Sequence, residues 1–400
     1  MIFLQVLGLL LLLVAALPTL VLGVEVLAAS FNRHAAARVV APGPMPRTQI
    51  LVPAHNESNG IVAALRQLAA HLPDNTEVLV IADNCSDNTA DLVRAFQTEH
   101  PQFRVVERSH ETQRGKGYAL DFGVKQLASN APEIVMVVDA DCLVYAGTLQ
   151  TLALQCQARN RPAQALYLMT TPPDASPKSK VAEFAWLVKN KVRPLGLHLL
   201  GLPCQLMGTG MAFTWQQITA TPLASGEIVE DLKMGLDLAK LGFAPVFCPQ
   251  AFVSSTFPDS DKAIADQRSR WEHGHMAMIL KTIPWLSAHA MRRANGQLAA
   301  LGLDLTVPPV VALLMFDSLL ALAGGAATWV WGFTLLSWLL APVLVLLTAL
   351  MLAWIVFGRD VLSFKHVLSI PVYLLSKLPI YFNFVFNRQV KWNRAKRGNE

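Results

Sequence analysis

Charged residues are scarce in this chain of 400 residues: they make up 15% of it, against 53% hydrophobic residues. Such an apolar composition excludes an ordinary soluble protein, and the length allows about two or three domains. Two segments, residues 2–24 and 318–358, contain no charged residue at all, whereas residues 48–283 have the mixed composition of a globular domain. The pattern predicts a polar domain between membrane-spanning segments.

Cysteine pairs and glycine-rich nucleotide loops are also absent. The five cysteines are an odd number and form no CxxC pair. This favours reduced thiols in a cytosolic compartment over a disulfide framework or a zinc site. The chain has no GxGxxG motif, and Gly115-Lys116-Gly117 lacks the spacing of a Walker loop. A Rossmann dinucleotide fold and a P-loop NTPase are therefore excluded.

The N-terminal apolar run is long enough to cross a membrane, which takes about 20 residues. A cleaved signal peptide is the alternative. Because no Lys or Arg precedes the run and it exceeds a usual signal core, we expect an uncleaved anchor at residues 1–30. Arg33, Arg38 and Arg47 follow in a linker, residues 31–47. They predict that the next domain lies on the cytoplasmic side.

The second uncharged segment is too long for one spanning helix. Gly324-Gly325 and the pair Trp329 and Trp331 predict a break near one interface. We therefore expect two transmembrane helices within residues 303–358, at about 303–325 and 333–357. Asp317 falls inside the first of these two, where a carboxylate is costly. A structural hydrogen bond and a functional role are both open for it.

The segments on either side of these two helices have the composition of interfacial segments. We expect residues 284–302 to lie at the membrane interface, and residues 359–400 to form an interfacial or re-entrant helix followed by a basic tail. That tail favours contact with anionic lipid over nucleic acid, and a solvated tail that obeys the positive-inside rule is the alternative. Together these segments predict a multi-pass protein of the inner (plasma) membrane. The basic residues of the tail are Arg388, Lys391, Arg394, Lys396 and Arg397.

Residues 48–283 alternate between apolar runs and helical patterns, which is typical of a parallel α/β sheet. Such sheets bind ligands beyond the carboxyl ends of their strands. Asp83 and Asp139 both fall at such ends. The four predicted strands centre on residues 50–52, 78–81, 103–106 and 134–138.

Asp139 and Asp141 directly follow the most apolar of these runs. Two carboxylates with this spacing can share a divalent cation such as Mg²⁺ or Mn²⁺, which prefers oxygen ligands and phosphates. A surface turn with two aspartates is the alternative.

Asp83 is a candidate to accept a hydrogen bond from a base or ribose, whereas we expect Asp87 to cap the next helix.

Two further motifs lie on predicted helices. Glu230-Asp231 opens one of them, where either carboxylate complements the helix dipole or serves as general base for an acceptor hydroxyl. In Gln267-x-x-Arg270-Trp271, the arginine is placed to contact diphosphate oxygens and the tryptophan to face a sugar. The alternative is a helix with one buried tryptophan and a solvated arginine.

The sequence gives weaker signals at five more side chains. Lys116 is either a phosphate ligand or a solvated lysine. Trp186 and Lys189 are candidates only for lining an acceptor path. His273 and His275, two residues apart on a helix, point to different faces, so we do not expect them to form a metal cluster.

The order of these motifs resembles that of the membrane-bound family-2 inverting glycosyltransferases. This group includes cellulose, hyaluronan and poly-N-acetylglucosamine synthases and ceramide glucosyltransferase. The resemblance covers about residues 48–285, with weaker agreement in the membrane segments. It rests on the whole series: VPAHNE at 52–57, Asp83, Gly115-Lys116-Gly117, Asp139-x-Asp141, Gly208-Thr209-Gly210, Glu230-Asp231 and QxxRW at 267–271.

The resemblance implies a GT-A-type α/β fold and a nucleotide-sugar donor, usually UDP-linked. It implies that Asp139 and Asp141 serve the diphosphate and a Mg²⁺ or Mn²⁺ ion, and that Asp231 is the general base. The implied donor-binding residues are Pro53, Ala54, Glu57, Asp83, Lys116, Asp139 and Arg270. The implied acceptor-binding residues are Gly208, Glu230, Gln267 and Trp271.

Two departures from the family pattern bear on function. Val229 precedes Glu230 where polymer synthases often have Thr, and only two spans are expected after the domain. Both put processive secretion in question, although a homo-oligomer or partner subunit would complete a channel. We therefore expect transfer from a UDP-sugar to a polysaccharide or lipid acceptor, with single transfer to a lipid as the alternative.

Two rivals come from other classes. A nucleotidyltransferase would need a glycine-rich, basic loop after the first strand, which the chain lacks. A catalytically inactive membrane scaffold or carbohydrate-binding subunit would not need the complete set of carboxylates.

Overall fold

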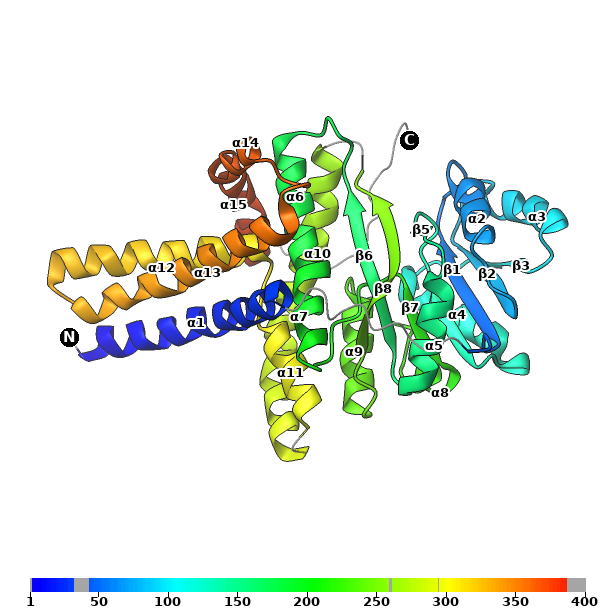
Figure 1. Cartoon of the computed structure of the whole chain (residues 1–400), viewed down its shortest axis with the longest axis horizontal. Helices are drawn as coiled ribbons and strands as arrows, with labels where there is room; N and C mark the ends of the chain where they lie inside the picture. The colour runs from blue at the N-terminus through cyan, green and yellow to red at the C-terminus, as the bar shows by residue number, and fades with distance from the viewer. Residues whose placement is uncertain (1, 32–42, 259–260, 294, 387–400) are drawn as a thin grey trace.

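A mixed α/β domain carries an elongated bundle of long helices on one side (Figure 1). The computed structural model describes residues 2–31, 43–258, 261–293 and 295–386. Arg33, Arg38 and the predicted basic tail lie outside the described residues.

Within the described residues, eight strands form one sheet in the order β3-β2-β1-β4-β7-β6-β8-β5. The neighbours from β3 to β4 are parallel, as are β6 and β8. β7 runs antiparallel to both β4 and β6, and β5 runs antiparallel to β8. The strands are β1 Thr48–Ala54, β2 Thr76–Asp83, β3 Phe103–Arg108, β4 Ile134–Val137, β5 Leu143–Val144, β6 Ala163–Thr170, β7 Met211–Thr214 and β8 Val246–Thr256.

The four strands predicted from the apolar runs are confirmed as β1 to β4. All four residues of β4 are buried, as expected for a strand covered on both faces. The core of the domain lies on the two faces of the sheet. The helices of the domain are α2 Ile61–Ala69, α3 Thr89–Glu99, α4 Lys116–Leu127, α5 Thr148–Arg159, α6 Pro177–Leu187, α7 Arg193–Leu199, α8 Trp215–Thr219 and α9 Glu230–Lys240. A π-helical segment, η3 (Val188–Val192), joins α6 to α7.

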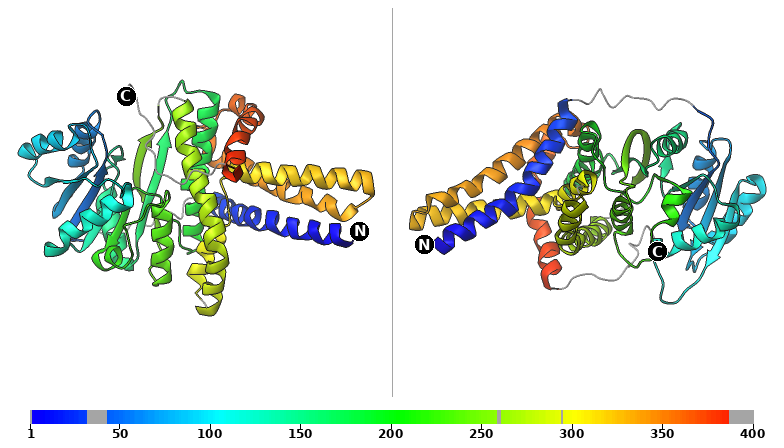
Figure 2. Two further views of the ribbon diagram at one scale, coloured as in Figure 1. Left: turned by 180° about the vertical axis from the view of Figure 1, so that it is seen from behind. Right: turned by 90° about the horizontal axis from the view of Figure 1, so that it is seen from below.

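In the described part of the chain, three helices are long and apolar enough to cross a membrane: Gln5–Phe31, Val310–Trp331 and Thr334–Gly358. They lie side by side in all views (Figures 1 and 2). The corresponding elements are α1 Ile2–Phe31, α12 Val310–Trp331, η4 Thr334–Leu339, α13 Leu340–Ala353 and η5 Trp354–Gly358. Thr19 of α1 donates a 2.8 Å hydrogen bond to Asp317 of α12. This is the structural role left open for Asp317.

The boundaries of the second spanning helix differ from the expected ones. A separate helix, α11 (Gly296–Leu305), ends before Pro308-Pro309, and α12 begins after them, because a residue before proline avoids helical geometry. α12 also passes through Gly324-Gly325 and ends at Gly332, which has a φ of 68°. Gly324 therefore does not break α12. Instead it lets η4 approach, since a Cβ there would lie 2.4 Å from the Leu336 carbonyl oxygen.

Helices α10 (Asp261–Arg293) and α11 lie across the end of the bundle, between it and the sheet (Figure 2). α10 continues through residue 283, where the sequence analysis placed the end of the domain. Of two further helices, α15 (Ile370–Phe386) packs beside it, and α14 (Phe364–Val367) contacts α6. A buried triad fixes this junction: Arg193 of α7 contacts Glu25 of α1 at 2.7 Å and Asp304 of α11 at 2.5 Å.

Candidate active site

A cavity of about 290 Å³ opens beyond the carboxyl ends of β1, β2 and β4, where the parallel topology predicts a ligand site. Its other walls come from the segments around 205–208 and 228–232 and from α10. Every residue that the sequence analysis assigned to the site lines this cavity: Pro53, Ala54, Glu57, Asp83, Lys116, Asp139, Asp141, Gly208, Glu230, Asp231, Gln267, Arg270 and Trp271. Their individual roles stay predictions.

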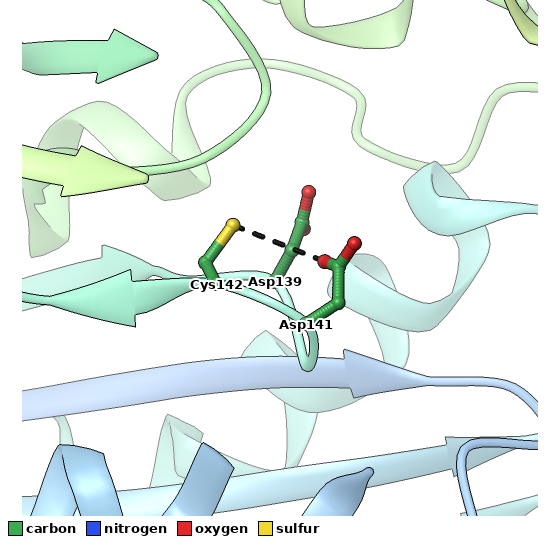
Figure 3. Close-up of side chains that lie close together, drawn as sticks. All are labelled: Asp139, Asp141 and Cys142. Carbon is green, nitrogen blue, oxygen red and sulfur yellow. Dashed lines mark hydrogen bonds between the residues drawn. The ribbon is translucent and has the colours of Figure 1, made fainter. Parts of the chain in front are cut away.

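Asp139 and Asp141 lie in the turn between β4 and β5, with their carboxylates on the same side (Figure 3). Oxygens of both and the Sγ of Cys142 lie within 4.8 Å of one another. The Asp139 amide donates a 3.0 Å hydrogen bond to Thr209 Oγ1, which anchors this turn. Burial raises the pKa of the Cys142 thiol well above its usual value, so the thiol stays protonated and is a poor ligand. The two carboxylates fit a hard divalent cation.

Lys116 is directed at this pair rather than at solvent. Its Nζ contacts the Asp139 carboxylate and donates a 2.8 Å hydrogen bond to the Gly208 carbonyl. Although burial opposes it, the Asp139 carboxylate holds the pKa of Lys116 above its usual value. Burial in turn raises the pKa of Asp139. The lysine thus offsets carboxylate charge beside the Asp139–Asp141 pair.

Gly117, next to it, has to be glycine. A Cβ there would lie 2.6 Å from the carbonyl oxygen of Leu223, so any side chain would push apart α4 and the segment after α8.

Glu230 and Asp231 form the first turn of α9, as the sequence predicted. The Leu232 amide donates a 2.8 Å hydrogen bond to Asp231 Oδ1. The other oxygen, Oδ2, faces Gly208, where a Cβ would lie only 3.4 Å away. Burial raises the pKa values of both carboxyls, that of Glu230 to about 8, with the neighbouring Asp231 charge adding to it. A raised pKa suits a carboxylate that has to accept a proton near neutral pH.

Gln267, Arg270 and Trp271 are spaced i, i+3, i+4 on α10, which brings them onto one face of the helix. The Trp271 ring lies 5.0 Å from the ring of Trp186, centroid to centroid. Trp186 also packs edge-on against Tyr167 at 5.5 Å. These rings make one wall of the cavity aromatic, and the face of a tryptophan ring is a surface on which sugars stack.

Asp83 has a partner that sequence reasoning missed. Arg108 donates a 2.6 Å hydrogen bond to Asp83 Oδ1, and both side chains are only 9% exposed. The register of β2 and β3 places the two residues side by side at the strand ends. The signal was therefore available, because both residues end predicted parallel strands. Tyr167 and Met207 also line the cavity without having been predicted.

The structure also shows where the other residues singled out in the sequence lie. The N-cap residue of α3 is Asn88 rather than the predicted Asp87, and its side chain makes no capping hydrogen bond. Asp87, one residue earlier, accepts hydrogen bonds from the Thr89 amide and the Ser58 amide. His273 bonds to the Ile380 carbonyl of α15, whereas His275 lines the cavity, so the two do face different ways. The five cysteines, all described, are free thiols.

The sequence is similar to several curated proteins. It is 26% identical over 259 residues to "Probable glycosyltransferase YdaM" of Bacillus subtilis (strain 168), which covers 59% of this chain and 57% of that protein. It is 23% identical over 263 residues to an N-acetylglucosaminyltransferase of Rhizobium meliloti (strain 1021), covering 63% and 61%. A beta-monoglucosyldiacylglycerol synthase of Trichormus variabilis (strain ATCC 29413 / PCC 7937) is 33% identical over 133 residues, covering 33% and 28%. The chain thus spans less than two thirds of the length of these relatives.

One solved structure shares the fold over most of the chain. It is the mannosyltransferase PcManGT from Pyrobaculum calidifontis in complex with GDP-Man and Mn²⁺, with a TM-score of 0.51 and 19% sequence identity. The match covers 85% of this chain and 99% of that one, and it identifies the domain as GT-A-like. A profile of the family described as "Glycosyltransferase like family 2" matches residues 46–274, more than half of the chain and nearly all of the α/β domain. The chain therefore belongs to glycosyltransferase family 2.

Proposed function

We propose that this protein is a membrane-anchored inverting glycosyltransferase that moves a sugar from a UDP-sugar to a hydroxyl of a polysaccharide or lipid acceptor. The observation that carries the proposal is the position of Asp231. It shares one cavity with the Asp139–Asp141 pair on one side and with the aromatic wall of Trp271 on the other. The residues proposed for the donor, the metal ion, the base and the acceptor therefore all line the same cavity.

The donor would lie across the carboxyl ends of β1, β2 and β4. Pro53, Ala54, Glu57 and Asp83 would line the nucleotide side, with Arg108 holding the Asp83 carboxylate in place. Lys116 and Arg270 would face the diphosphate, since their charges complement it. Asp139 and Asp141 would hold a Mg²⁺ or Mn²⁺ ion, which neutralises charge on the departing diphosphate.

The reaction is a single displacement. The acceptor oxygen forms a bond to the anomeric carbon while the bond from that carbon to the diphosphate oxygen breaks, and the configuration inverts. Asp231 takes the acceptor proton, because its raised pKa makes it a better base than an exposed aspartate. Glu230, with a pKa of about 8, holds its proton at neutral pH and would donate a hydrogen bond to the acceptor.

The membrane side of the proposal rests on the three apolar helices. We place the protein in the inner (plasma) membrane as a multi-pass protein, with the α/β domain in the cytoplasm, where UDP-sugars are made. Single transfer to a lipid remains the alternative to chain extension, and a homo-oligomer or partner subunit would be needed for a secretion channel. A catalytically inactive scaffold is the alternative from another class.

The test is UDP release by the full chain in lipid nanodiscs, across a panel of UDP-sugars with Mn²⁺ or Mg²⁺. Asp231→Asn should reduce release at least 100-fold, the lower bound for loss of a general base. Asp237→Asn is the matched control. It makes the same change on the same helix, but Asp237 pairs with Lys233 and Lys240 and does not line the cavity. If the wild-type protein binds UDP but releases no UDP from any UDP-sugar tried, the alternative of a catalytically inactive scaffold is favoured.

A further inference from the structure

A second, smaller cavity of about 60 Å³ lies where the α/β domain meets the helix bundle. It is lined by residues of α6, η3 and α10, and by Pro308, Pro309 and Val310 at the start of α12. It shares Trp186, Lys189, Trp271 and His275 with the main cavity. These four residues, here called the waist, therefore connect the candidate active site to the start of a membrane-spanning helix.

The walls of the second cavity carry an excess of positive charge. Its charged lining residues are three cations, Lys189, Arg193 and Arg268, and one carboxylate, Glu272. Arg193 is neutralised by Glu25 and Asp304, and Arg268 contacts Glu272 at 3.2 Å. Lys189 differs, because among the described residues no carboxylate lies in ion-pair contact with it. Its Nζ lies over the Trp186 ring, 5.4 Å from the centroid.

Two other polar atoms of the waist are buried without a hydrogen-bond partner. His275 is only 6% exposed, and its Nε2 has no hydrogen-bond partner in the described part of the chain. The same holds for Nε1 of Trp186. Burial lowers the pKa of His275 to about 3, so the ring is neutral, and it hydrogen-bonds to the backbone at Val307 and Leu305. Its single N–H is therefore used within the fold. The two unpartnered atoms are fully buried, so a ligand in the cavity would meet Lys189 rather than them.

A lysine that lines both cavities and has no carboxylate in ion-pair contact calls for a ligand with a negative charge and acceptor oxygens. A neutral diacylglycerol or a plain oligosaccharide would leave the lysine unpaired. A phosphate ester supplies both the charge and the oxygens. The two cavities also constrain the position of this ligand. Its hydroxyl has to reach Asp231 in the main cavity, and its apolar part has to pass Val310 toward the membrane.

We propose that the waist binds the phosphate of an acceptor lipid that carries its reacting hydroxyl close to that phosphate, with Lys189 as the main phosphate ligand. The inference rests on the proposed function and narrows its acceptor to phosphate-bearing lipids. Two sources share this chemistry, a glycerophospholipid with a free headgroup hydroxyl and a sugar linked to a polyprenyl diphosphate. Lys189 binds substrate here and takes no part in proton transfer.

The experiment uses the full chain in phosphatidylcholine nanodiscs with the active UDP-sugar. Four acceptors are compared at equal mole fraction: diacylglycerol, an alkyl glucoside, phosphatidylglycerol, and a monosaccharide linked to a polyprenyl diphosphate. The first two have a hydroxyl and no phosphate, and the last two have both. We expect kcat/KM at least tenfold higher for one of the phosphate-bearing acceptors, and which of the two it is identifies the source.

Variants of Lys189 test whether this residue binds the phosphate. Lys189→Met should raise KM for the phosphate-bearing acceptor at least tenfold and leave the Kd for UDP unchanged, and Lys189→Arg should restore most of the loss. Lys191→Met is the matched control, because Lys191 lies in the same π-helical segment, faces the Phe357 ring and lines neither cavity. A fall in kcat that is equal for all acceptors, with KM unchanged, would overturn the assignment and make Lys189 a charge partner of Asp231.

The two proposals fail in different ways. Equal or better transfer to diacylglycerol or the alkyl glucoside overturns the phosphate site and leaves the glycosyltransferase proposal intact. UDP binding without turnover of any donor overturns the proposed function, and the phosphate site falls with it.

Discussion

Lys377 of α15 donates a 2.9 Å hydrogen bond to Oε1 of Glu272 on α10, and the side chains are 5% and 6% exposed. Glu272 also contacts Arg268, whose guanidinium donates a 2.6 Å hydrogen bond to the Tyr373 hydroxyl. α15 is thereby pinned to the helix that carries Gln267, Arg270 and Trp271. The outer side of α15 exposes Val372, Leu375 and Leu378, which suits a helix lying on a membrane surface.

Breaking this contact should loosen the active-site helix. We expect Lys377→Met to destabilise the protein by about 3 kcal/mol, the lower end for a buried charge pair that loses one partner, since Arg268 still faces Glu272. Thermal unfolding in nanodiscs measures it. Lys365→Met on α14 is the control, because Lys365 is exposed and should change the midpoint little. Equal midpoints for both variants would mean that α15 does not hold α10.

The Asp83–Arg108 pair should control nucleotide binding. Arg108→Leu leaves the Asp83 carboxylate buried without its cation, so we expect the Kd for UDP to rise about tenfold, equivalent to about 1.4 kcal/mol. Arg104→Leu on the same strand is the comparison. Arg104 makes only an exposed 3.5 Å contact with Glu77, and such pairs contribute about 0–1 kcal/mol. Calorimetric titration with UDP distinguishes them, and an unchanged Kd in Arg108→Leu would contradict the expected role of Asp83.

Glu230 should make stability depend on pH. Burial, and then repulsion from Asp231, raises its pKa in the folded protein to about 8, from about 4.3 in an unfolded chain. Between these values the folded state keeps a proton that the unfolded state has lost, so stability falls as pH rises through this window.

Glu230→Gln removes this titrating group. The free energy of unfolding of the variant, relative to wild type, should therefore increase from pH 5 to pH 8 by about 1.4 kcal/mol per pH unit at most. Denaturation at several pH values, without donor or metal, gives the difference. A constant gap between the two proteins would show that Glu230 ionises normally. Some slope should remain in the variant, since burial also raises the pKa of Asp231 and of Asp139.

The divalent cation should depend on carboxylate oxygens and not on the nearby thiol. We expect Asp141→Asn to raise the Mn²⁺ concentration for half-maximal UDP release at least tenfold. Cys142→Ser should shift it less than twofold, since the raised pKa keeps the thiol protonated. Metal titration of UDP release measures both. A larger effect from Cys142→Ser would identify a softer, sulfur-containing site.

Much of the fold and the site could be predicted because it depends on local patterns. Apolar runs mark β1 to β4, and the parallel topology brings their carboxyl ends to one edge. Asp83 and Asp139 therefore share a cavity although they are far apart in sequence. The antiparallel strand β7, inserted between β4 and β6, was not predicted, because its four residues carry no distinguishing pattern.

The sequence by itself determined the positions of β1 to β4, the presence of three apolar spanning segments though not their bounds, and the spacing of the QxxRW motif, since each follows from neighbouring residues. Only the tertiary structure decided which charges meet. Thr19 finds Asp317 across 298 residues, and Arg193 joins Glu25 to Asp304 across three helices. Such partners are chosen by packing, because a buried charge is tolerated only where the folded chain brings its complement within reach. Lys189 has no carboxylate in ion-pair contact among the described residues, and its place between the two cavities exists only in the folded protein.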